Sequence, residues 1–216
     1  MGHTKKAIRI LKECSMTAVA RGRHFFNHHA QHWDDQISQT EIERISNLFS
    51  KYITKLNDPV LDMGSGTGVL IPVLTSEYSL NTIVEFDIAE NMLQSAKKKY
   101  QNQNALHFIH GDGHKPPFAD NAFATVLCFS VFPHFSNRHL IIKEFRRILK
   151  TNGRFIIMHL MDHYALNQLH SDAGEAVSRD MMIPAGELAQ FLVQFQFTCE
   201  RVIEQSDLYL VDAHKI

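Results

Sequence analysis

VLDMGSGTGVL, residues 60–70, is the stretch of sequence that decides the fold of this chain. Val60–Met63 predicts a short buried strand, and a helix from Gly68 to about Glu77 follows the glycine-rich turn. Glycines at such a junction permit a tight turn and a close approach of the backbone to a ligand. The turn lacks the lysine of a phosphate-binding loop, and its third glycine comes one position too early for the dinucleotide pattern GxGxxG. Asp62 adds negative charge there, which favours a cationic ligand over a pyrophosphate.

Strands and helices alternate along most of the chain. Apolar runs predict further strands at Thr82–Phe86, Leu106–Ile109, Thr125–Phe129 and Arg154–His159. Apolar residues at helical spacing predict helices at Gln39–Leu56, Ile88–Tyr100, Asn137–Leu149 and Gly186–Val193, and a weaker helical pattern runs through residues 1–30. Near the end, two more strands are predicted on either side of a short turn, Thr198–Gln205 and Leu208–His214. The pattern predicts an α/β fold with a doubly wound, mostly parallel seven-stranded sheet, a C-terminal antiparallel hairpin and helices on both faces.

Three acidic residues lie at the ends of three successive predicted strands: Asp62, Asp87 and Asp112. The carboxyl ends of parallel strands meet at one crevice, where ligands of open α/β sheets bind. Asp87 can accept hydrogen bonds from two ribose hydroxyls, although it could also cap the helix that starts near Ala89. Asp112 is placed to take the exocyclic amine of adenine. With Asp62 beside a cation, the set suits S-adenosylmethionine, whose ammonium and sulfonium groups are positively charged.

Several segments resemble class I (Rossmann-like) S-adenosylmethionine-dependent methyltransferases. Residues 60–70 resemble the family's first motif, (D/E)xGxGxG, and four further segments resemble later family motifs: Glu85–Leu93, His110–Phe118, Phe123–Phe135 and Glu144–Arg154. The pattern is similar to the small-molecule branch that includes ubiquinone and menaquinone biosynthesis methyltransferases, and it runs from about Trp33 to the C-terminus. Three positions depart from the family, which often has Gly, Ser and Asp where this chain has Glu85, Ala89 and Ala124.

The resemblance implies S-adenosylmethionine as cofactor and S-adenosylhomocysteine as product. The cofactor-binding residues that it implies are Asp62, Gly64, Ser65, Gly66, Gly68, Asp87, Ile88, Met92, Gly111, Asp112, Gly113 and Phe129. Residues 1–56 are expected to form a helical cover over the active site, and residues 57–216 the Rossmann-like domain, in one compact unit.

The acceptor is expected between this cover, the loop after the fourth strand and the insert after the fifth. Candidate acceptor-binding residues in these segments are His28, His29, Trp33, Phe132, His163 and Tyr164. His134 and His159 are the candidate general bases, because each lies at the carboxyl end of a strand. Two alternatives stay open for the histidines: a metal site, since His159, His163 and His170 are four and seven residues apart, or ordinary structural histidines. No metal ligand is assigned.

The composition of the chain limits the classes of function that the protein is expected to have. The chain has 216 residues, 22 basic and 23 acidic, so no excess of positive charge favours nucleic acid. Three separate cysteines, no long apolar run and a charged N-terminus predict a cytoplasmic protein without a membrane span. The expected partner is a small-molecule acceptor, and the sequence does not predict an oligomeric state. The expected function is methyl transfer to that acceptor; the alternative is a non-catalytic protein on the same fold that responds to S-adenosylmethionine or to a metal.

Overall fold

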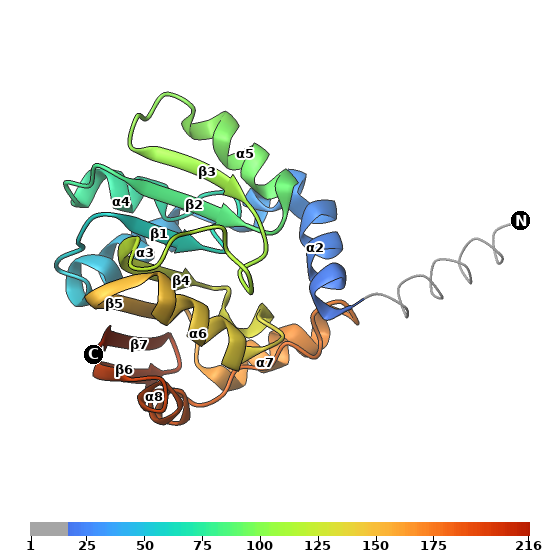
Figure 1. Ribbon diagram of the computed structural model, residues 1–216. Coiled ribbons are helices and arrows are strands. Elements are labelled where there is room, and N and C mark those ends of the chain that lie inside the picture. The colour runs from blue at the N-terminus through green and yellow to red at the C-terminus, as the bar shows by residue number, and fades with distance from the viewer. Residues whose placement is uncertain (1–16) are drawn as a thin grey trace, which may run out of the picture.

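The computed structural model describes residues 17–216, so the helical pattern expected in the first sixteen residues lies outside the described part. Seven strands form one sheet in the order β3-β2-β1-β4-β5-β7-β6 (Figure 1). The strands are β1 (Val60–Met63), β2 (Ile83–Asp87), β3 (Leu106–His110), β4 (Phe123–Phe129), β5 (Leu149–His159), β6 (Phe197–Gln205) and β7 (Leu208–Lys215).

Parallel pairing joins β3, β2, β1, β4 and β5, whereas β7 runs antiparallel to both β5 and β6. Residues Ser206 and Asp207 form the turn of the β6–β7 hairpin, as the sequence predicted. The fold class is therefore confirmed.

Helices cover both faces of this sheet (Figure 1). They are α2 (Ala18–His29), α3 (Gln39–Tyr52), α4 (Ile71–Glu77), α5 (Glu90–Tyr100), α6 (Arg138–Ile148), α7 (His163–Asp172) and α8 (Ala185–Val193), with short 3-10 turns η1 (Ala30–His32), η2 (Asp34–Gln36) and η3 (Phe132–His134). No helix within residues 17–216 is long and apolar enough to cross a lipid bilayer.

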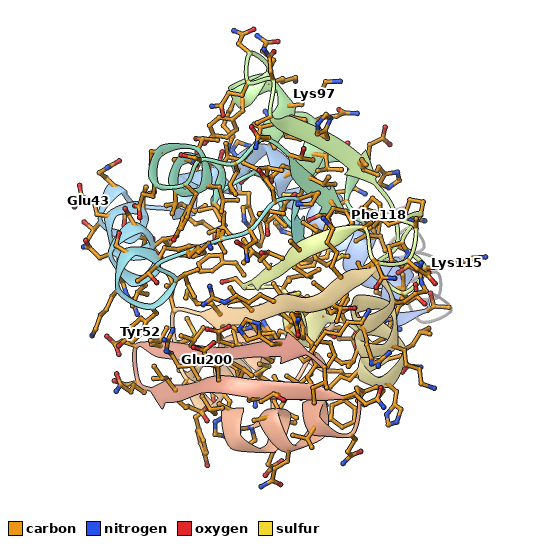
Figure 2. The ribbon with its side chains drawn as sticks, turned by 60° about the vertical axis from the view of Figure 1, so that its left-hand side comes forward. Glu43, Tyr52, Lys97, Lys115, Phe118 and Glu200 are labelled. Carbon is orange, nitrogen blue, oxygen red and sulfur yellow. The ribbon has the colours of Figure 1, made fainter. Side chains whose placement is uncertain are left out.

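Alternation along the strands explains the two layers. Successive side chains of a strand point to opposite faces, so Leu61 and Met63 pack with residues of α6 and α8, whereas Val60 packs with residues of α3 and α4. Polar residues stay on the outer helix faces, as Glu43 of α3 does in Figure 2. Packed side chains cover both faces of the sheet, so a functional site can form at the carboxyl ends of the strands.

Several boundaries differ from the predicted ones for local reasons. The segment after the glycines is a turn, and α4 begins only at Ile71. Leu149 belongs to β5 and not to the preceding helix, because it pairs with Phe123 of β4. Ala89 is the N-cap of α5, so the alternative role of Asp87 as that cap is wrong, although Asp87 accepts a hydrogen bond from the Ala89 amide.

Candidate active site

The glycine-rich turn is attached to the end of β2. The amides of Gly64 and Ser65 both donate to the carbonyl oxygen of Phe86, at 2.7 and 3.1 Å. Gly64 has a φ of 76°, and a Cβ atom there would lie 2.2 Å from Cγ2 of Val131. Only glycine fits both the backbone angle and this close approach, so the turn brings the β1 and β4 loops together.

Asp87 holds two loops with its two carboxylate oxygens. Oδ2 accepts the amide of Gly66 at 2.8 Å, and Oδ1 accepts the amide of Ala89 at 2.7 Å. Burial raises the pKa of Asp87, and these two backbone donors oppose that rise because they favour the ionised form. Each carboxylate oxygen has a further lone pair, so Asp87 can still accept hydrogen bonds from a ligand.

Behind the turn, Asp62 and Glu85 are buried next to each other in register. Within the described residues, Asp62 Oδ2, Ser65 Oγ and both carboxyl oxygens of Glu85 have no hydrogen-bond partner. Burial, and secondarily the Asp87 charge, raises the pKa of Asp62 to about 8. Burial and the neighbouring Asp62 raise the pKa of Glu85 well above its ordinary value. The buried oxygens of Asp62 and Ser65 suit a ligand that brings a cationic hydrogen-bond donor.

Asp112 is oriented by a histidine. The Asn137 amide donates to His114 Nε2 at 3.3 Å, so the ring proton resides on Nδ1, which contacts Asp112 Oδ1 at 2.8 Å. The second carboxylate oxygen of Asp112 remains available to an amine. Gly113 follows, where a Cβ atom would lie 2.9 Å from the Phe135 ring.

These groups line one cavity of about 250 Å³. Ten of the twelve cofactor-binding residues implied by the sequence are on its wall: Asp62, Gly64, Ser65, Gly66, Asp87, Ile88, Met92, Asp112, Gly113 and Phe129. The other two lie outside the lining. Gly68 turns the chain toward α4, and the amide of Gly111 donates to the Asp87 carbonyl at 3.0 Å.

Aromatic side chains from separate segments form another part of the wall. The Phe26 ring of α2 meets Trp33 and His134 edge-on, with centroids 5.6 and 5.0 Å apart. His134 Nδ1 contacts Asp180 Oδ2 at 2.8 Å, and both side chains are largely shielded from solvent. His134 is thus a histidine on the cavity wall that a carboxylate orients.

His159, the other candidate base, is buried and outside the lining. It pairs with Tyr209 across β5 and β7, and its ring meets the Tyr209 ring edge-on at 5.8 Å. Burial, and secondarily His134 and His170, lowers the pKa of His159 to about 3. This histidine is therefore neutral at physiological pH, and the structure places it among packed side chains.

Of the candidate acceptor-binding residues, Trp33 lines the cavity and the others do not. His28 and His29 are exposed on α2, whereas Phe132 is fully buried in the core. His163 and Tyr164 lie at a second, separate hollow beside Glu204, which contacts His163 Nδ1 at 2.6 Å. His163 begins α7, and its contact with Glu204 of β6 places it at that hollow and not at the cavity.

No group of three His, Cys, Asp or Glu side chains in residues 17–216 is arranged to hold a metal ion. His163 and His170 lie on α7, but His159 belongs to β5, and His170 Nδ1 contacts the carbonyl of Asp180. The spacing that suggested a shared helix face therefore does not bring these three ring nitrogens together.

Sequence reasoning missed residues that depend on long-range packing. Asp180 is 46 positions from His134, in a segment between α7 and α8 without periodicity. Asp34 was also missed; its carboxylate accepts from Thr67 Oγ1 at 2.5 Å and pairs with Lys99 at 2.6 Å. Arg23 of α2 lines the cavity as well. No local motif pointed to any of them.

Residues 61–157 match the family model described as a methyltransferase domain. This part of the chain is similar to methyltransferase domains. The match agrees with the predicted cofactor, S-adenosylmethionine, and with the predicted product, S-adenosylhomocysteine.

Two curated relatives cover this methyltransferase domain. The demethylmenaquinone methyltransferase of Thermotoga maritima is 34% identical over 104 residues, 48% of this chain and 44% of that protein. The ubiquinone/menaquinone biosynthesis C-methyltransferase UbiE of Desulfotalea psychrophila is 30% identical over 110 residues, 49% of this chain and 44% of that protein. The matches span less than half the length of these relatives. They support a methyltransferase similar to the quinone-biosynthesis branch.

Solved structures resemble the chain over more of its length. A S-adenosylmethionine-dependent methyltransferase from Aquifex aeolicus matches with a TM-score of 0.62 and 18% identity, covering 84% of this chain and all of that one (100%). At this identity the likeness shows the fold, which is the Rossmann-like methyltransferase fold.

Proposed function

We propose that this protein transfers the methyl group of S-adenosylmethionine to the hydroxyl-bearing ring of a small, flat acceptor. The observation that carries the proposal is the pair of His134 and Asp180 on the wall of the same cavity as Asp62, Asp87 and Asp112. Aromatic walls at Phe26 and Trp33 favour a flat, apolar acceptor. The names of the relatives, which refer to quinone precursors, support the same class.

The residues present fit the cofactor. Asp62 Oδ2 and Ser65 Oγ, buried without partners in the described chain, would hold the ammonium group. Asp87 would accept the ribose hydroxyls, and Asp112 the adenine amine. When bound, S-adenosylmethionine supplies a methyl group on a sulfonium, which is already a good leaving group. The protein therefore has to orient the acceptor, exclude water and remove a proton.

His134 is proposed to remove that proton. Its Nδ1–H donates to Asp180 Oδ2, which leaves Nε2 unprotonated as the base for an acceptor hydroxyl. The carboxylate of Asp180 fixes the ring orientation and stabilises the imidazolium that forms. Asp180 is thus a positioning residue, and His134 is the catalytic one.

Residues 17–56 are proposed to act as part of a cover that excludes water. Asn27 Oδ1 accepts the amide of Asn91 at the start of α5, at 2.8 Å, and Asp34 binds both Thr67 and Lys99. These contacts join the cover to the glycine-rich turn and to α5. In Figure 1, α2 lies across the carboxyl ends of the strands.

The test is methyl transfer from labelled S-adenosylmethionine to a metabolite extract and to a panel of hydroquinones and phenols. We expect His134→Gln to lower turnover about 10²- to 10⁴-fold, as loss of a general base does, and Asp180→Asn to lower it less. Both variants should bind S-adenosylhomocysteine like the wild type in calorimetric titration.

His107→Gln is the matched control, because His107 is exposed on β3 outside the cavity, and it should keep full turnover. Unchanged transfer in His134→Gln would overturn the assignment of the base. Cofactor binding without transfer to any acceptor would favour the non-catalytic alternative.

A further inference from the structure

The two ends of the cavity differ in charge. Three carboxyl groups, Asp62, Asp87 and Asp112, line the end that suits the cofactor. Two more carboxyl groups on the wall already have protein partners: Asp180 pairs with His134, and Glu41 accepts hydrogen bonds from Ser38. Among the described residues, Arg23 is the only lysine or arginine on the cavity wall. Its side chain makes no hydrogen bond or ion pair with any residue between 17 and 216. Arg23 is exposed, so its guanidinium on the cavity wall is available to pair with a carboxylate that a ligand brings.

Helix geometry places Arg23 next to the proposed acceptor site. Arg23 and Phe26 are three residues apart and share one face of α2, separated by about 4.5 Å along the helix axis. Phe26 contacts both Trp33 and His134. A ring held against Phe26 and Trp33 would therefore lie between a base at one end and a permanent cation at the other.

Gly22 adds room at the same place. It lies inside a helix, where glycine is unfavourable by about 1 kcal/mol relative to alanine, and it lines the cavity. A Cβ atom at Gly22 would meet nothing within 4 Å. Packing therefore does not require this glycine, and its effect is to leave space beside the Arg23 side chain.

We propose that the acceptor is an aromatic carboxylic acid, whose carboxylate pairs with Arg23 while its hydroxyl faces His134. This inference rests on the proposed methyl transfer and narrows the class of acceptor. The planar guanidinium can bind a carboxylate through two parallel hydrogen bonds, which a neutral ring of the same shape cannot reproduce. Arg23 is thus a specificity-determining residue for acceptor charge.

The methionine part of the cofactor also carries a carboxylate, which is the other candidate partner of Arg23. The two sources are separated by titrating the full-length protein with S-adenosylhomocysteine, which carries that carboxylate, and then titrating the loaded protein with aromatic probes. The probes are 2-naphthoate and its uncharged isostere 2-naphthamide. Binding is followed by calorimetry, with the fluorescence of Trp33, the single tryptophan of the chain, as a second signal.

We expect the loaded wild type to bind 2-naphthoate at least about tenfold more tightly than 2-naphthamide, as a charge-assisted pair provides. Arg23→Gln should abolish this preference, Arg23→Lys should keep part of it, and both should bind S-adenosylhomocysteine normally. Circular dichroism checks that α2 remains folded in each variant.

Three results would overturn the inference: equal affinity of the wild type for both probes, no binding of 2-naphthoate, or a preference that survives in Arg23→Gln. Loss of S-adenosylhomocysteine affinity in Arg23→Gln would assign the arginine to the cofactor instead. Failure here is distinct from failure of the proposed function, because transfer that depends on His134 would be unaffected by these outcomes.

Discussion

The cofactor end and the acceptor end of the cavity are built in different ways. At the cofactor end, Asp62, Asp87 and Asp112 lie at or just beyond the carboxyl ends of the parallel strands β1, β2 and β3, and backbone amides hold the loops together. At the acceptor end, side chains from α2, η3 and the segment before α8 meet only through tertiary packing, as His134 and Asp180 do.

This difference has a physical consequence for substitutions. Backbone hydrogen bonds and strand register preorganise the cofactor end, so removal of one carboxylate there disturbs two loops at once. Each residue of the acceptor end contacts the cavity through its own side chain, so a substitution there should alter acceptor binding and leave cofactor binding intact. Substitutions at the two ends should therefore have separable effects on cofactor binding and on acceptor turnover.

Asp87→Ala should lower S-adenosylhomocysteine affinity by about a hundredfold or more. The variant loses the acceptor for the amides of Gly66 and Ala89, and each buried unsatisfied donor costs about 1 to 3 kcal/mol. Calorimetric titration measures the loss, and circular dichroism should show the fold retained. Asp87→Asn, which keeps one carbonyl acceptor, should lose less; near-normal affinity in both variants would contradict our cofactor site.

Gly22→Leu should lower acceptor turnover by about tenfold, because the new side chain occupies space that a Cβ atom enters without contact. Its affinity for S-adenosylhomocysteine should stay within about twofold of the wild type. Gly22→Ala is the matched control: it should keep turnover and raise the free energy of unfolding by about 0.5 to 1 kcal/mol. If Gly22→Leu impaired cofactor binding as strongly as turnover, the two ends of the cavity would not be independent.

The smallest effect concerns the pH dependence of stability. The raised pKa of Glu85 means that the folded protein retains a proton that the unfolded chain has lost above its ordinary carboxyl pKa. Because the folded state then binds more protons than the unfolded one, the free energy of unfolding falls as pH rises. The pKa of Asp62, raised to about 8, acts in the same direction up to that pH.

Glu85→Gln cannot lose this proton, so the variant should gain stability relative to the wild type as the pH rises from about 5 to about 8. Urea unfolding gives the free energy of unfolding of the variant and of the wild type at each pH. The difference between the two proteins is then compared at the two pH values, which cancels any effect of the amide that does not depend on pH. Glu43→Gln on the exposed face of α3 (Figure 2) should follow the wild type at both values. Parallel pH curves for the wild type and Glu85→Gln would show that Glu85 is ionised in the folded protein.

Most of the fold could be predicted from the sequence because its signals are local. The apolar runs of β1, β4 and β5 and the turn between β6 and β7 are readable without knowledge of distant residues. Element ends were less predictable, since Leu149 joins β5 only through pairing with Phe123. Helix α7 placed His163 and Tyr164 at a separate hollow, which no periodicity in that segment indicated.

The sequence by itself determined the sheet, the glycine-rich turn and the three acidic residues at strand ends, because strand order and loop position follow from short-range patterns. Only the tertiary structure decided which histidine faces the cavity. His134 lies in η3 after β4 and His159 ends β5, yet His134 is on the cavity wall with Asp180, whereas His159 is buried against Tyr209, where burial lowers its pKa. The reason is that the burial and the partner of a side chain depend on residues far away in the chain, which leave no local signal in the sequence.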